Sequence, residues 1–430
     1  MKGCATHSNF ITLPICAAAL SLVGCGGGVA HFPVSNKVVT GGDGAVPSGP
    51  LVQAPDGYLY GTTVAGGHDN QGTVFRIGFD GTESVLYSFR GGGDDGGGPA
   101  DGLIVGSDGN LYGTTRGGGV GSCGGQQPSG LIVPVGTCGT VFQLTLAGSE
   151  EVLYFFHGGD DGGLPITPLR QLPNGNFYGT TATGGTYLDG TVFQITPTGQ
   201  ETVLYNFGTS GPTDALSPLA GLILGTDGNL YGATPFGGDF NEGTVFTVTP
   251  AGTESVLVSF AGGAVGQTPT QPLVQASDGD FYGTTSNGGL TEASCPAGCG
   301  TVFQITPSGV LITLYELGRQ ADDGVLPSSA LIQASDGNLY GTTRSGGTGG
   351  CNTGCGTVFK ITPGGVETVL YSFKGADDGA VPQATLVQGS DGALYGTTSA
   401  GGQRDQGTVF RITLGGVETV LHSFGSEATQ

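Results

Sequence analysis

Apolar and polar residues alternate along the chain in short runs that are separated by glycine-containing turns. In a representative stretch, runs rich in Val, Leu, Thr, Tyr and Phe occupy residues 330–333, 339–343, 357–361 and 367–373. Runs of this length and composition between turn residues are typical of β-strands, and the Asp336-Gly337 pair supplies the positive φ of a tight hairpin. No helical periodicity follows the N-terminal segment. The pattern predicts an all-β chain built of units of four strands, which we name A to D.

Three short motifs recur in the same order seven times, which identifies an internal repeat. The tetrad Tyr-Gly-Thr-Thr, with Ala for the first Thr in one copy, begins at Tyr60, Tyr112, Tyr178, Tyr231, Tyr282, Tyr340 and Tyr395. A second tetrad, Gly-Thr-Val-Phe, begins at Gly72, Gly139, Gly190, Gly243, Gly300, Gly356 and Gly407. An Asp-Gly or Asn-Gly turn precedes each tyrosine, at Asp56, Asp108, Asn174, Asp227, Asp278, Asp336 and Asp391. Successive copies therefore lie 51 to 66 residues apart.

Four strands in each repeat predict a β-propeller of seven four-stranded antiparallel blades. Strand C of the sixth repeat has bulk on both sides, with Phe359 and Ile361 on one and Val358 on the other, as a blade packed between two neighbours requires. The alternative is an open β-solenoid of stacked units. The propeller is expected over residues 41–430, with repeats at about 50–89, 102–156, 168–207, 221–260, 272–317, 330–373 and 385–424.

The repeat resembles a known bacterial family. Its pattern is Leu-x-Gln-x-x-Asp-Gly-x-Leu-Tyr-Gly-Thr-Thr, then Gly-Thr-Val-Phe, then Val-Leu-Tyr-x-Phe, and it covers residues 50–424. It is similar to the GloVer-type (choice-of-anchor) tandem repeat of bacterial surface proteins, which carry varied anchoring signals. The resemblance implies secretion and anchoring at the cell surface, and it brings no known activity. The A–turn–B portion also resembles the sensor propellers of two-component regulators, which implies the fold alone.

The N-terminus reads as an export signal. Lys2 precedes a short apolar stretch at residues 11–23, too short to span a bilayer and typical of a secretory signal peptide. Residues 22–25, Leu-Val-Gly-Cys, resemble a bacterial lipobox. That resemblance implies a signal peptide at 1–24, lipidation of Cys25, a lipidated tether at 25–40 and an outer-membrane or cell-surface location, since Gly26 stands where inner-membrane lipoproteins typically carry Asp. The alternative is a plain signal peptide cut near Gly24.

Composition changes the picture in two ways. Glycine accounts for 89 of 430 residues, but the chain is 37% hydrophobic and only 11% charged, unlike a disordered chain. The glycines fall largely at the turns and tetrads of the repeat. The net charge of −22, with 12 Lys and Arg residues, argues against a nucleic-acid partner.

The cysteines after Cys25 occur in pairs, and each pair lies in one of the long connections between the two tetrads. Between the two tetrads the spacers are 8, 23, 8, 8, 14, 12 and 8 residues long, and the three long ones contain cysteine pairs. In an exported chain these predict three local disulfides, Cys123 with Cys138, Cys295 with Cys299, and Cys351 with Cys355. The alternative of metal binding is less favoured because each pair supplies only two ligands.

The B–C and D–A connections of a propeller lie on one face, here called the loop face, and the A–B and C–D connections lie on the other, the turn face. All long and variable connections belong to the loop face, so we expect function there. Candidate ligand-binding residues on it are Arg116, His157, Asp160, Asp161 and Arg344. Candidate Ca²⁺ ligands are the aspartate pairs Asp94-Asp95, Asp160-Asp161, Asp322-Asp323 and Asp377-Asp378, although Asp-Gly loops also favour turns without any metal.

We expect a monomeric, surface-anchored binding or scaffold module for a glycan, a protein or a small molecule. No cofactor other than Ca²⁺ is implied, and no residue qualifies as catalytic, because the chain has no nucleophile elbow, zinc motif or phosphate loop. The alternatives are a propeller enzyme acting on carbohydrate, such as a lyase, lactonase or sugar dehydrogenase, and a structural component of the cell surface.

Overall fold

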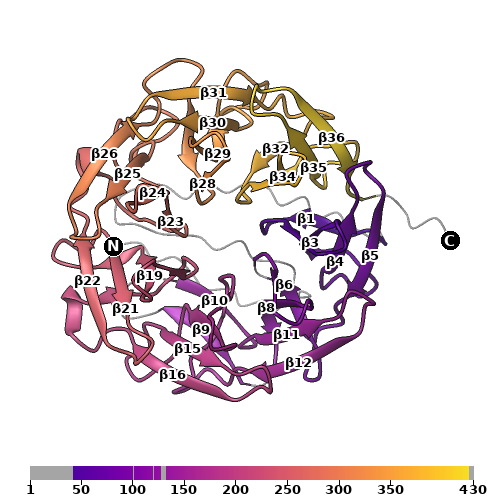
Figure 1. The fold of residues 1–430 in the computed structure, drawn as a ribbon, viewed down its shortest axis with the longest axis vertical. Coiled ribbons are helices and arrows are strands. Elements are labelled where there is room, and N and C mark those ends of the chain that lie inside the picture. The colour runs from indigo at the N-terminus through magenta and orange to yellow at the C-terminus, as the bar shows by residue number, and fades with distance from the viewer. Residues whose placement is uncertain (1–41, 100, 120, 127–131, 426–430) are drawn as a thin grey trace, which may run out of the picture.

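The computed structural model describes residues 42–99, 101–119, 121–126 and 132–425. It confirms a ring of seven antiparallel β-blades around a central axis (Figure 1). The predicted signal peptide at 1–24, Cys25 and the tether at 25–40 lie outside the described residues. Within the described part of the chain, no helix combines the length and hydropathy needed to cross a membrane.

The strands follow the chain blade by blade. Blade 1 contains β1 (Ala45–Pro47), β2 (Val52–Gln53), β3 (Leu59–Ala65), β4 (Thr73–Ile77) and β5 (Glu83–Ser88). Blade 2 contains β6 (Gly96–Pro99), β7 (Ile104–Val105), β8 (Leu111–Gly118), the hairpin β9 (Cys123–Gln126) and β10 (Ile132–Gly136), β11 (Thr140–Leu144) and β12 (Glu150–Phe155). Blade 3 contains β13 (Arg170–Gln171), β14 (Phe177–Thr181), β15 (Thr191–Ile195) and β16 (Glu201–Asn206). Blade 4 contains β17 (Ala215–Leu216), β18 (Ile223–Leu224), β19 (Leu230–Thr234), β20 (Phe236–Gly237), β21 (Thr244–Val248) and β22 (Glu254–Ser259).

The last three blades repeat this order. Blade 5 contains β23 (Val274–Gln275), β24 (Phe281–Thr285), β25 (Thr301–Ile305) and β26 (Leu311–Glu316). Blade 6 contains β27 (Gly324–Pro327), β28 (Ile332–Gln333), β29 (Leu339–Gly346), β30 (Thr357–Ile361) and β31 (Glu367–Ser372). Blade 7 contains β32 (Ala380–Pro382), β33 (Val387–Gln388), β34 (Leu394–Ala400), β35 (Thr408–Ile412) and β36 (Glu418–Ser423). Two short 3₁₀ turns, η1 (Gly211–Thr213) and η2 (Gly263–Val265), lie in D–A connections.

Strand A differs from its predicted form. In blade 6 it was expected as one run at 330–333, but two separate strands, β27 and β28, both pair with β29. Leu326 adopts a left-handed φ of 58°, and its N–H donates to the carbonyl of Cys299 in blade 5 at 2.8 Å. The backbone after it therefore leaves the sheet toward the axis. Every junction between blades has such a bond, donated by the N–H groups of Val46, Gly98, Leu164, Ser217, Thr268, Leu326 and Val381.

The residues of the first tetrad each have a packing role, as blade 1 illustrates. The Tyr60 hydroxyl donates to Asp56 of its own turn at 2.7 Å, and Gly61 leaves room for the ring of Phe75 on β4. Thr62 donates to the carbonyl of Asp101 in blade 2 at 3.0 Å. The Oγ1 atom of Thr63 lies 2.8 Å from that of Thr73, the Thr of the second tetrad. The motif is thus explained by packing within and between blades.

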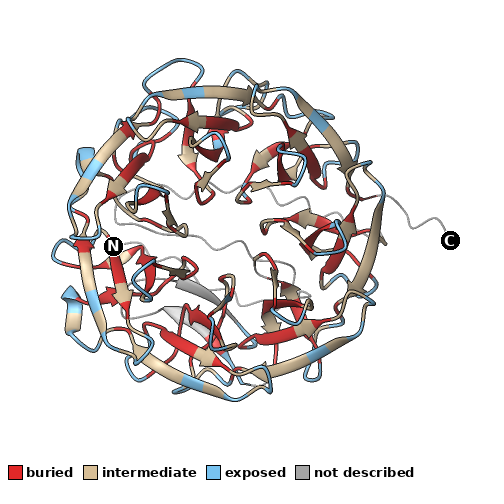
Figure 2. Ribbon diagram, in the orientation of Figure 1, coloured by how far each residue is buried: buried red, intermediate tan, exposed pale blue. Residues whose placement is uncertain are grey.

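The core lies between the blades rather than at the centre of the ring. Strands B and C are buried on both sides, whereas the outer D strands are only half-buried (Figure 2). At each junction one blade's aromatic residues pack against the next blade's apolar residues. The ring closes in the same way, because Phe75 of blade 1 meets Phe424 of blade 7 at 5.1 Å between ring centroids.

Candidate functional site

The two faces of the ring differ as the sequence predicts. On the turn face, six aspartates of the A–B turns accept from the tyrosine four residues later, at 2.7 to 2.9 Å. Although burial opposes the effect, hydrogen bonds from the turn backbone and the tyrosine lower the pKa of Asp108 and Asp227. Each strand-A glutamine reaches the neighbouring turn, as Gln171 does when it accepts from the Ser107 N–H at 2.7 Å. The turn face is therefore a structural surface.

The paired aspartates of the loop face divide into two environments. Their first members, Asp94, Asp160, Asp322 and Asp377, are exposed. The second members are turned into the junction between blades, where each accepts from a tyrosine hydroxyl of the preceding strand D. These bonds are Tyr87 to Asp95 at 3.1 Å, Tyr154 to Asp161 at 3.0 Å, Tyr315 to Asp323 at 2.8 Å and Tyr371 to Asp378 at 2.8 Å. The second aspartate of each pair thus already has donors from its own loop and strand.

A glutamate from the start of the following strand D completes this arrangement, which we call the junction triad. Its members are Tyr87, Asp95 and Glu150 between blades 1 and 2, and equivalents occur at five other junctions. Burial first, and then in most triads the neighbouring aspartate, raises the glutamate pKa to about 7 in Glu83, Glu150, Glu201, Glu254 and Glu418, and to about 8 in Glu367. At least one oxygen of each of these glutamates is buried without a hydrogen-bond donor.

The chain varies the triad in two informative ways. Between blades 7 and 1, His422 replaces the tyrosine and its Nε2 lies 3.3 Å from Asp43 Oδ2. Between blades 4 and 5, Val258, Val265 and Leu311 replace all three members at once. Because the three change together within one chain, we regard the triad as one energetic unit.

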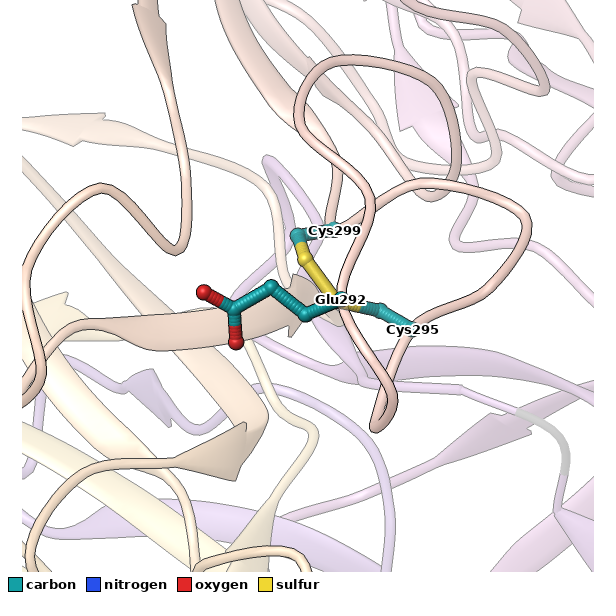
Figure 3. Close-up of side chains that lie close together, drawn as sticks. All are labelled: Glu292, Cys295 and Cys299. Atoms are coloured by element: carbon teal, nitrogen blue, oxygen red, sulfur yellow. A yellow bond between two sulfur atoms is a disulfide. The ribbon is translucent and has the colours of Figure 1, made fainter.

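The three predicted disulfides are confirmed: Cys123–Cys138, Cys295–Cys299 and Cys351–Cys355. Each covers the D–A connection that follows it, as Cys123 and Cys138 do against Gly158. In the described part of the chain, three potential metal ligands converge only at Glu292, Cys295 and Cys299 (Figure 3). The two sulfur atoms there are joined to each other, so Glu292 remains as a single carboxylate ligand.

His157 and Asp161 are brought together at the loop face, as the sequence suggested. The His157 Nδ1 atom lies 3.0 Å from Asp161 Oδ2. The same oxygen accepts from the His157 N–H at 2.9 Å and from Tyr154. His157 is exposed, and Asp160 beside it has no role in this contact. The pair therefore has the geometry of a junction triad with an added imidazole.

Arg116 and Arg344 occupy the same position of the repeat, directly after the first tetrad, but they have different surroundings. Arg116 lines a cavity of about 200 Å³ together with Ser48, Asp101 and residues of every other blade. Arg344 is exposed and does not line this cavity. Burial lowers the pKa of the Arg116 guanidinium. The cavity contacts all seven blades and therefore lies on the axis of the ring.

The tips of the eight-residue B–C loops form a further feature of the loop face, which the sequence pattern did not predict. In blades 1, 4 and 7 a residue in the left-handed region accepts a backbone N–H with its side chain: Asn70, Asn241 and Asp405, at 2.9, 2.9 and 2.8 Å. Blade 3 has Leu188 at this place, with a φ of 68° and 52% exposure. Tyr187 beside it and Phe240 of blade 4 are 46% and 59% exposed. Aligning the four loops would have revealed the exception.

Comparison with known proteins supports the repeat and the fold. The model of the Gloeobacter/Verrucomicrobia repeat matches residues 25–126, 133–295 and 289–430. Virginiamycin B lyase from Staphylococcus aureus is similar in structure, with 15% identity, 83% of this chain and 92% of that chain covered, and a TM-score of 0.52. A putative 6-phosphogluconolactonase from Bacteroides uniformis has 15% identity, coverages of 87% and 94%, and a TM-score of 0.51. At such identities the likeness extends to the fold alone. No curated protein matches the sequence.

Proposed function

Because the chain belongs to the Gloeobacter/Verrucomicrobia repeat family, we propose that it is an exported binding module, displayed at the bacterial surface, that holds a glycan or protein ligand on its loop face. The three disulfides support an oxidising compartment. The loop face has all the variable loops, whereas the turn face consists of uniform turns. Rigid scaffolds with variable loops on one face commonly use those loops for recognition.

The main support for this proposal is the left-handed conformation of Leu188 at the exposed tip of the B–C loop in blade 3. A leucine in the left-handed region is strained by about 1 kcal/mol or more, and it forgoes the hydrogen bond that Asn70, Asn241 and Asp405 make in the same loop position. Such strain persists only where the surrounding structure or function maintains it. At the blade junctions, as at Leu326, a hydrogen bond to the preceding blade maintains it, whereas Leu188 lies at an exposed loop tip. Leu188 and Tyr187 of blade 3 and Phe240 of the neighbouring blade 4 are exposed apolar residues on one face. Large aromatic side chains of this kind act as anchors in binding interfaces.

We expect Leu188→Asn to stabilise the protein by about 1 kcal/mol, because Asn tolerates the left-handed region and restores the hydrogen bond to the loop backbone. The same change is expected to weaken ligand binding. Calorimetric unfolding and a glycan array of residues 26–430 measure the two effects. Asn70→Leu, at the same position in blade 1, is the matched control and should destabilise without affecting binding. Array signals that survive both Leu188→Asn and Tyr187→Ala with Phe240→Ala would contradict this location of the site.

Surface anchoring has its own test. We expect Cys25→Ser to release the protein from the membrane fraction, because the thioether that would hold the lipid is lost. Fractionation of expressing cells and mass spectrometry of the N-terminal peptide provide the measurement. A variant that stays with the membrane fraction would mean that another element anchors the chain.

The enzyme alternative draws on the fold likeness to a lyase and a putative lactonase. Among the described residues that line the axial cavity, Asp101 and Arg116 are the only charged ones. A single carboxyl group and a single guanidinium favour ligand recognition over acid–base chemistry, which usually employs a pair of titratable groups. The binding module therefore remains the preferred function.

A further inference from the structure

Blade 2 breaks the symmetry of the axial cavity. In every blade three residues stand between a Pro and a Leu of the D–A connection, at least one of them lines the cavity, and in blade 2 the lining residue is Asp101. The equivalent residues in the other blades are Gly49, Thr167, Ala220, Gln271, Ser329 and Ala384, none of them charged. Arg116 of the same blade is the other charged lining residue. Both charges of an otherwise neutral cavity thus come from a single blade.

In the described part of the chain, the charged group that acts on the Arg116 guanidinium is Asp101 of the same blade, which does not form a close ion pair with it. Its aliphatic stem packs over Gly98, with Cγ 3.3 Å from the position of a Cβ on that glycine. Its Nε atom is buried and makes no hydrogen bond, and no ion pair within 4.0 Å joins it to any described carboxylate. Burial lowers its pKa. A buried guanidinium with an unused Nε–H donor and no close ion pair is unfavourable, so an anion that accepts from this donor would lower the free energy of the site.

Asp101 and Ser48 complete the polar lining beside Arg116. One oxygen of Asp101 accepts the N–H of Gly102 at 2.8 Å, and burial raises the Asp101 pKa to about 7. The hydroxyl of Ser48 is buried without a hydrogen-bond partner. The other hydroxyl groups of the described lining, those of Thr270, Ser328 and Thr385, each have a hydrogen-bond partner. Among the described lining residues, the buried atoms without a hydrogen-bond partner, Ser48 Oγ and Arg116 Nε, therefore belong to blades 1 and 2.

We propose that the axial cavity binds a small hydroxylated anion, with a carboxylate or phosphate group on the Arg116 guanidinium and hydroxyl groups on Asp101 and Ser48. Guanidinium groups pair with carboxylate and phosphate through two parallel hydrogen bonds. The volume of about 200 Å³ lies below the roughly 300–1,000 Å³ of pockets for drug-sized ligands, so the ligand is no larger than about one sugar unit. This site is separate from the loop tips that carry the proposed function.

The test is isothermal titration of residues 26–430 with gluconate, glucuronate, glucose 6-phosphate and inorganic phosphate, with glucose as the neutral probe. We expect one-to-one binding of at least one hydroxylated anion, and the carboxylate and phosphate arms separate the two kinds of anionic group. Arg116→Gln is expected to weaken that binding at least 10-fold, which corresponds to about 1.4 kcal/mol. Arg344→Gln, at the same repeat position but outside the cavity, should leave it unchanged.

Three outcomes would overturn the proposal. In the first, no anion of the panel binds with a dissociation constant below about 10 mM. In the second, wild type and Arg116→Gln bind the anion equally well. In the third, Arg116→Gln and Arg344→Gln lose the same amount of anion affinity. The unfolding temperature of each variant shows whether a loss reflects unfolding, and Asp101→Asn provides a second variant that should lose the preference for gluconate over acetate. Tyr187→Ala with Phe240→Ala should leave anion binding intact. Failure of the axial site is therefore distinguishable from failure of the loop-tip site.

Discussion

Raising the pH from 5 to 8.5 is expected to lower the unfolding temperature of this protein by about 5–10 °C. The cause is the six junction glutamates, whose pKa values burial and, in most triads, a neighbouring aspartate raise from 4.5 to about 7 or 8. A raised carboxyl pKa means that the folded state holds the proton more tightly than the unfolded state. Stability is therefore full below about pH 4.5 for these groups and is lost as the pH rises through 7.

The size of the effect follows from the number of triads. One pKa unit is worth about 1.4 kcal/mol, but these carboxyl groups are only partly buried and solvent screens them. We therefore expect about 1 kcal/mol from each triad. The turn aspartates act in the opposite direction, because hydrogen bonds lower the pKa of Asp336 and Asp391 although burial opposes it. Their contribution is present above about pH 3.8 and is lost below it, so maximal stability is expected near pH 5.

Two adjacent residues of β12 give a matched comparison. Glu150 is a triad member, whereas Glu151 is exposed. Glu150→Gln should raise stability at pH 8.5 and leave it nearly unchanged at pH 5, because the amide is neutral at every pH. Glu151→Gln should shift neither value by more than about 0.5 kcal/mol, as is usual for surface substitutions. Calorimetric unfolding at the two pH values decides the matter, and equal pH dependence in wild type and Glu150→Gln would refute the triad account.

The order of the strands and most of their bounds could be predicted because the signals of the repeat are local. Strand C of blade 6 was expected at 357–361 and is observed there, since alternating Thr, Val, Phe and Ile residues bounded by Gly specify a strand by themselves. Strand D was expected at 367–373 and ends one residue earlier. The prediction of strand A as a single run was wrong, because the strand is interrupted where the Leu326 N–H bonds to the preceding blade. A hydrogen bond between blades leaves no local pattern.

The candidate site was predictable only as far as a face. Loop lengths and cysteine pairs located the variable loops, because these are counted along the chain. The partners of Asp95 and Asp161 could not be inferred, since the tyrosine and glutamate that flank them come from two different strands D. The different surroundings of Arg116 and Arg344 depend on which residues of seven blades meet at the axis. Side chains that converge from separate repeats require the closed ring.

Gly407→Ala is expected to destabilise the protein by about 3 kcal/mol or more and to lower its unfolding temperature by about 5 °C or more. Gly407 has a φ of 95°, outside the regions open to residues with a side chain. A Cβ there would collide with the carbonyl oxygen of Thr398 and would lie 2.8 Å from Cδ of Pro47. Since Pro47 belongs to blade 1 and Gly407 to blade 7, the collision occurs where the ring closes.

This junction is more vulnerable than the other six because no covalent connection joins blade 7 to blade 1. It is held by apolar packing and by a few hydrogen bonds, among them Val46 N–H to the Gln406 carbonyl at 2.9 Å and Ser390 N–H to Gln53 at 3.0 Å. Gly190→Ala makes the same collision between blades 3 and 4, where the chain itself keeps the blades together.

Both variants should lose stability, but only Gly407→Ala should become sensitive to limited proteolysis near both ends of the propeller at temperatures below unfolding. Gly415→Ala is the neutral control, because this exposed turn position holds Ala or Ser in other repeats. An unfolding temperature for Gly407→Ala within about 2 °C of wild type would show that closure between blades 7 and 1 contributes little to the stability of the ring.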